Sequence, residues 1–116
     1  MEYEHDGHTY KLTKLGLGDA KEYLAKMIEL GFFDEPMITM LQHSDEIERR
    51  MFRSNLQLLN EQGDWIPMGK ELTASHFNGK VDDYFHLLWK AVDYNFASFL
   101  SGGWATGLVA AADPEE

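Results

Sequence analysis

The twenty residues Val81–Leu100, VDDYFHLLWKAVDYNFASFL, decide the fold. Their apolar side chains recur at helical spacing and cover a very wide arc of the helix surface: Val81, Tyr84, Phe85, Leu88, Trp89, Val92, Phe96 and Phe99. An arc this wide requires contacts on more than one side of the helix. We therefore expect this helix to lie at the centre of the fold.

Helical spacing and end signals predict three shorter helices before it. The first begins after a capping Asp19 and ends at Gly31, because glycine suits the left-handed position after a helix. A second short helix follows Pro36, which is favoured at the first helical position. A third begins at a capping Ser44 and ends at Gly63. The residues expected on its buried side are Ile47, Met51, Phe52, Asn55, Leu58 and Leu59.

The N-terminus predicts a β-hairpin. Asp6-Gly7 separates the strand-like segments 2–5 and 8–15, and Asp-Gly is a strong two-residue hairpin signal. We expect a loop at 64–70, while 72–77 fits a short helix or a strand. The predicted fold is mainly α: one helical domain over 1–100 with a small N-terminal hairpin packed on it. A flexible Gly/Ala-rich acidic tail is expected over 101–116.

Composition excludes several classes of function. The chain has 116 residues, no cysteine, and a formal net charge of −10. Without cysteine there is no disulfide, thiolate zinc site or cysteine nucleophile. The negative charge opposes binding to nucleic acid. No segment approaches the roughly 18 apolar residues of a membrane helix, and the polar N-terminus is unlike a secretory signal. We expect a cytoplasmic protein.

The candidate chemical groups favour no enzyme. His5 and His8 flank the hairpin turn and could bind a metal only with a third ligand, which the spacing does not supply. Asp82 and Asp83 lie in the first turn of the long helix, where the helix dipole favours negative charge. His43 fits a helix end. We expect no catalytic residue, cofactor or metal.

Methionine and aromatic residues suggest binding to another protein. The chain holds six methionines, and methionine surfaces adapt to varied partners. The candidate partner-binding residues are Phe32, Phe33, Met37, Met40, Met51 and Phe52. They fit either core packing or an apolar groove that receives a helix or strand of a partner. The wide apolar arc of the last helix also suits a homo-oligomer interface.

The layout of residues 5–100 resembles the small tail assembly chaperones of long-tailed bacteriophages, of siphovirus or prophage type. The resemblance rests on Gly7–Leu12, on Leu17–Ala20 opening a helix, and on Phe77-Asn78-Gly79 before the long helix. That helix ends in Asn95–Phe99, an aromatic-Asn-aromatic stretch that such chaperones often carry before a variable tail.

This resemblance implies a non-enzymatic function in phage assembly. Such chaperones bind the tape measure protein and keep it soluble while tail tube subunits assemble around it. They act in the host cytoplasm, are absent from the finished particle, and often have a frameshifted longer form. Two other interpretations stay open: a small acidic inhibitor that mimics DNA and acts on a host nucleic-acid enzyme, and a structural tail or head-completion protein.

Overall fold

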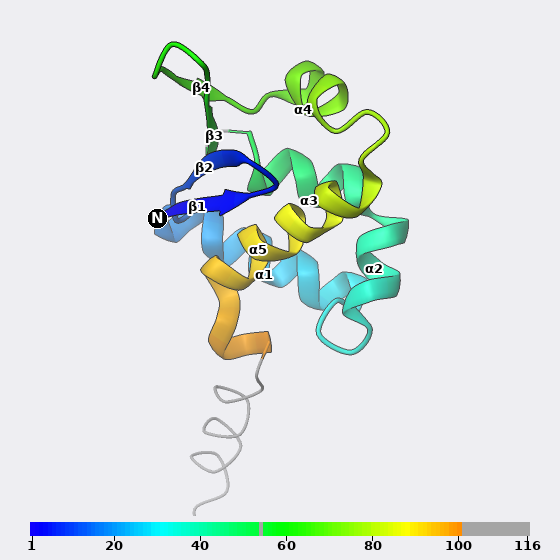
Figure 1. Ribbon diagram of the computed structural model, residues 1–116. Helices are drawn as coiled ribbons and strands as arrows, with labels where there is room; N and C mark the ends of the chain where they lie inside the picture. Colours follow the sequence, from blue (N-terminus) through cyan, green and yellow to red (C-terminus); the bar gives the residue numbers. More distant parts are fainter. Residues whose placement is uncertain (54, 101–116) are drawn as a thin grey trace, which may run out of the picture.

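The computed structural model describes residues 1–53 and 55–100 (Figure 1). Within these residues the chain forms five helices and a four-stranded antiparallel sheet, so the fold is mixed α and β rather than mainly α. The elements in chain order are β1 (Glu2–His5), β2 (His8–Leu12), α1 (Leu17–Leu30), α2 (Pro36–Gln42), α3 (Ser44–Met51), β3 (Leu56–Leu59), β4 (Trp65–Pro67), α4 (Lys70–His76) and α5 (Val81–Leu100).

The predicted hairpin is present. β1 and β2 pair with Tyr3 opposite Tyr10 and His5 opposite His8. Asp6 and Gly7 both have positive φ, 51° and 79°, as a tight turn between twisted strands requires. The hairpin is one half of a larger sheet, whose strand order is β1-β2-β3-β4.

The prediction of one helix from Ser44 to Gly63 is wrong beyond Met51. α3 ends there, and Leu56–Leu59 forms β3, which pairs with β2 so that Leu12 lies opposite Leu56. Leu56 is fully buried. Strand formation satisfies the backbone groups along the second edge of β2, which a helix would have left unpaired. This tertiary gain outweighs the helical spacing of Leu58 and Leu59.

The predicted loop at 64–70 also contains a strand. β4 pairs with β3, with Leu58 opposite Ile66. The turn between them is held by the side-chain oxygen of Asn60, which accepts hydrogen bonds from the backbone amides of Gln62 and Asp64 at 3.0 and 2.8 Å. Gly63, which was expected to end a helix, lies in this turn with φ 84°, and Asn60 with Gly63 is a turn signal between two strands. The ambiguous segment 72–77 lies mostly in helix α4.

Helix ends follow the predictions in part. Gly31 ends α1 with φ 82°, and Pro36 begins α2. Neither Asp19 nor Ser44 caps a helix through its side chain, since α1 already begins at Leu17 and α3 begins at Ser44 itself. The predicted tail 101–116 lies outside the described residues.

The core lies between α5, the other helices and the inner face of the sheet (Figure 1). Leu87, Leu88 and Val92 of α5 are fully buried, as are Tyr23 and Met27 of α1. α5 bends at Phe96, whose φ and ψ of −132° and 31° are not helical. The central position predicted for this helix is confirmed, and its N-terminal half carries the surfaces described next.

Candidate functional site

An apolar groove runs between α2 and the N-terminal half of α5, and we call it the α2–α5 groove. It encloses about 660 Å³. Its lining residues are Pro36, Met37, Met40, Leu41, Asp82, Phe85, His86 and Trp89. Each helix supplies one wall of the groove. Phe85 and Trp89 lie one turn apart and so on the same face of α5, and Met37 and Leu41 do the same on α2.

The groove exposes large apolar side chains to solvent. Met37 is 75% exposed, Leu41 59% and Trp89 37%, whereas Met40 is buried. The indole of Trp89 stacks on the buried ring of Phe32, with 6.0 Å between ring centroids. Single exposed apolar residues are ordinary, but several gathered in one groove are typical of an interaction site.

The structure divides the six candidate partner-binding residues. Phe32, Met51 and Phe52 are almost completely buried, so they belong to the core and offer no surface to a partner. Phe33 is half-buried and packs edge-on against Phe32. Met37 and Met40 line the α2–α5 groove, and partner binding there stays a prediction.

The sequence analysis missed the α5 wall of the groove. In the sequence, Phe85 and Trp89 belong to the apolar arc of the long helix, and such an arc suits either the core or a self-association surface. The available signal was the width of the arc. A core on one side of the helix would bury only part of this arc. The sequence could not show which of its side chains α2 leaves exposed to solvent.

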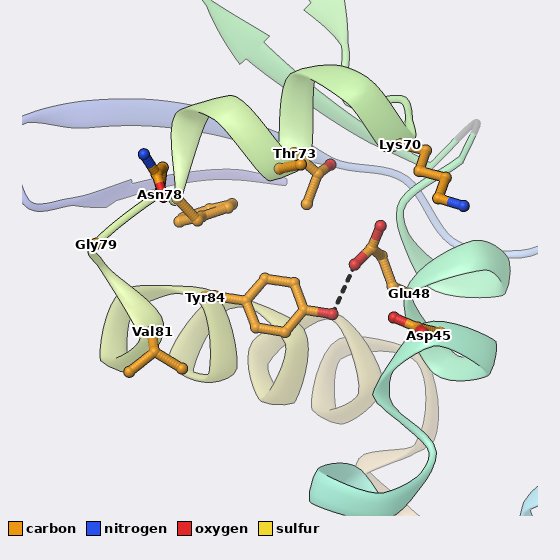
Figure 2. A pocket seen from close by; sticks show the side chains of 10 residues that line it. Asp45, Glu48, Lys70, Thr73, Asn78, Gly79, Val81 and Tyr84 are labelled. Atoms are coloured by element: carbon orange, nitrogen blue, oxygen red, sulfur yellow. Dashed lines mark hydrogen bonds between the residues drawn. The ribbon is translucent and has the colours of Figure 1, made fainter.

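A second, polar pocket lies beside the groove and is drawn in Figure 2. It encloses about 530 Å³ between α3, α4 and the start of α5. Asp45 and Glu48 project from α3, and Lys70 projects from the start of α4 (Figure 2). Tyr84 of α5 donates a hydrogen bond to Glu48 at 2.6 Å.

The environment of Tyr84 keeps its hydroxyl protonated. Burial raises the pKa of Tyr84, and the neighbouring carboxylate of Glu48 raises it further. The tyrosine therefore acts as a fixed hydrogen-bond donor that orients Glu48. Neither Asp45 nor Glu48 forms a salt bridge within the described residues, so the pocket presents two carboxylates that a cationic group could approach.

Four of the five histidines gather where the hairpin meets the helices. The ring of His5 stacks on His86 at a centroid distance of 4.3 Å, and its Nε2 lies 2.8 Å from Asp83 Oδ1. On the other strand, His8 meets His76 edge-on at 4.6 Å. The fold thus pairs each hairpin histidine with one from the C-terminal helices, which sequence spacing could not reveal.

Hydrogen bonds, burial and neighbouring charges shift the pKa values in this cluster. Burial, and then the nearby His8, lower the pKa of His76; burial and His5 do the same for His86. The hydrogen bond from His5 lowers the pKa of Asp83. Among the described residues, no three potential ligands are grouped to hold a metal ion.

No protein-family model, curated protein or solved structure matches this chain. None of the helices in the part of the chain that the structure describes combines the length and the hydropathy of a membrane-spanning segment.

Proposed function

We propose that this protein is a phage tail assembly chaperone that binds an apolar helical segment of the tape measure protein in the α2–α5 groove. The observation that carries the proposal is the groove itself, in which Met37, Leu41 and Trp89 are exposed together. The resemblance of residues 5–100 to such chaperones supplies the identity of the partner.

The groove has the physical properties that a reversible chaperone requires. Its rim carries Met37, an unbranched and polarizable side chain that adapts to different apolar surfaces. A long helical partner exposes apolar stripes before assembly, and covering one stripe prevents aggregation. The net charge of −10 keeps the complex soluble.

The proposal places the protein in the host cytoplasm and outside the finished particle. Tail tube subunits are the second proposed partner, recruited while the tape measure protein is held. Binding is by protein–protein contact and without catalysis.

Co-purification tests the proposal. The tagged protein is recovered from cells that express its own gene cluster, and bound proteins are identified by mass spectrometry. We expect the tape measure protein to be recovered with the unaltered chain and lost with Met37→Glu combined with Leu41→Glu. Ile38→Glu is the matched control, because Ile38 is exposed on the same helix but does not line the groove.

Two results would contradict the proposal. Recovery of a host nuclease or polymerase in place of tail proteins would support the acidic-inhibitor interpretation. Detection of this chain in purified finished particles would support a structural tail or head-completion protein.

A further inference from the structure

We infer that the α2–α5 groove takes a basic amphipathic helix, whose apolar stripe fills the groove and whose lysine or arginine side chains meet the acidic residues around it. The inference rests on the proposed function and deepens it, because it specifies the chemistry of the bound segment.

The walls of the groove favour a helix over an extended strand. Both walls are helices, whose backbone groups are already paired within the helix. No strand residue lines the groove, so an extended segment bound there would leave the amides and carbonyls that face the groove without backbone partners. A helix satisfies its backbone internally and can present apolar side chains at i, i+3, i+4 and i+7.

Unpaired carboxylates surround the groove. Asp82 lines it, and the exposed Asp34 and Glu35 directly precede Pro36, which lines its end. None of these three forms a salt bridge within the part of the chain that the structure describes. By contrast, Glu22 and Glu46 are paired with arginines. Asp34, Glu35 and Asp82 thus have no direct ion-pair partner in the described residues, and Lys90 is the cation whose charge reaches the groove-lining His86.

The polar pocket adds two carboxylates, Asp45 and Glu48, and one cation, Lys70, next to the groove. Val81 is 62% exposed and lines the pocket, and it lies one helical turn before Phe85, which lines the groove. The two cavities thus occupy neighbouring faces of the first turns of α5. Asp45 and Glu48 line this neighbouring pocket (Figure 2) and add to the negative charge on this side of α5.

Charge also argues against a second copy of this chain as the occupant. Two copies would each bring a net charge of −10 to the interface. Like charges oppose such an approach, whereas a basic segment is attracted and steered to the site.

Two fluorescein-labelled model peptides test the inference. Both are helices of about 18 residues, roughly 27 Å long, with leucines at i, i+3, i+4 and i+7. One carries lysines on the remaining face, and the other carries glutamates at the same positions. Affinity for the full chain is measured by fluorescence anisotropy at about 0.01 M and about 0.15 M ionic strength, where the Debye length is ~30 and ~8 Å.

At the lower ionic strength, we expect the lysine peptide to bind at least about tenfold more tightly than the glutamate peptide. This difference in affinity should shrink at the higher ionic strength. Met37→Glu should abolish binding of both peptides, and Ile38→Glu should leave it unchanged. Glu35→Gln with Asp82→Asn should reduce the preference for lysine. Glu61→Gln with Asp64→Asn removes the same charge from the β3–β4 turn and should have no effect.

Contrary results separate two parts of the inference, the basic character of the bound helix and the groove as its docking site. Equal affinity for the two peptides, with binding still lost in Met37→Glu, overturns the basic helix and leaves the groove as the chaperone site. Binding that Met37→Glu does not change overturns the groove as the docking site, while co-purification separately decides the chaperone function.

Two further results would identify another occupant and overturn the inference. Dimerisation in sedimentation velocity that Met37→Glu abolishes would identify a second copy. Tighter peptide binding by Trp104→Ala with Leu108→Asp would identify the C-terminal segment of this chain.

Discussion

The side-chain oxygen of Asn95 accepts a hydrogen bond from the backbone amide of Leu15 at 2.9 Å. The bond joins the segment that leaves the hairpin to α5, across 80 positions of sequence. The Nδ2 of Asn95 donates to the carbonyl of Ala91 at 3.0 Å, which fixes the orientation of the amide. One side chain thus ties the sheet to the helix that carries the groove.

Asn95→Ala should destabilise the fold by about 1–3 kcal/mol, because it leaves the half-buried amide of Leu15 without its partner. Urea denaturation followed by circular dichroism measures the loss. Asp93→Ala on the same helix is the control, since Asp93 makes no side-chain bond within the described residues. A loss in Asn95→Ala no larger than in the control would show that the bond contributes nothing.

Phe52→Ala should cost about 3–5 kcal/mol of unfolding free energy, as expected for truncation of a buried phenylalanine. Met37→Ala should change stability by less than about 0.5 kcal/mol, because Met37 is mostly exposed. The same denaturation experiment compares the two. Equal losses would contradict the division of these candidate residues between core and groove.

Tyr23→Phe should leave stability unchanged or raise it by up to about 1 kcal/mol. The Tyr23 hydroxyl is buried and has no hydrogen-bond partner among the described residues. The ring would keep its stacking on Phe96 and its contact with the Arg50 guanidinium. Thermal and urea unfolding of the variant and the parent give the comparison.

Tyr84→Phe is the matched control for Tyr23→Phe, because it removes a hydroxyl that is bonded to Glu48. It should destabilise by about 1.5–3 kcal/mol, the range for a hydrogen bond to a charged group. If Tyr23→Phe lost as much as Tyr84→Phe, the buried hydroxyl of Tyr23 would have a partner after all.

Acidification should destabilise the fold through His76 and His86. Their pKa values are lowered in the folded state, so the unfolded chain binds more protons and the free energy of unfolding rises with pH. The full contribution is present above the ordinary histidine pKa of about 6.5 and is lost as the pH falls below it. Melting temperatures between about pH 7.5 and about pH 5 should show this decline.

Two variants separate the histidine cluster from general acid sensitivity. His76→Gln with His86→Gln should flatten the profile in this window, whereas His43→Gln, at the junction of α2 and α3, should retain it. Asp83 affects stability at lower pH than the histidines. Because its pKa is lowered in the folded state, its contribution is lost only as the pH falls below the ordinary carboxyl pKa of about 4. An unchanged slope in the double variant would exclude these histidines as its source.

The two hairpins differ in how far their turns and strands can be predicted from local sequence. The two-residue turn of the first hairpin requires positive φ at both central positions. Few residue pairs accept this conformation and Asp6-Gly7 is one of them, so the turn was predictable. At β3, Leu56, Leu58 and Leu59 fit helical and strand spacing about equally. There the deciding contact is β2, more than forty residues earlier in the chain.

The candidate site was predictable only in part. Met37 of α2 and Met51 of α3 carry the same side chain, yet one is 75% exposed and the other is fully buried. Composition identified a methionine-rich region but not its solvent-facing members. That division depends on how α2 and α3 lie against α5.

By itself, the sequence determined the hairpin turn at Asp6-Gly7, the end of α1 at Gly31, the start of α2 at Pro36 and the central position of α5. These features follow from local sterics and from periodicity within one segment. Only the tertiary structure decided that Leu56–Leu59 is a strand, that His5 stacks on His86, and that Met37 and Trp89 line one groove. Each of these depends on contacts between distant segments, whose free energy outweighs weak local preferences.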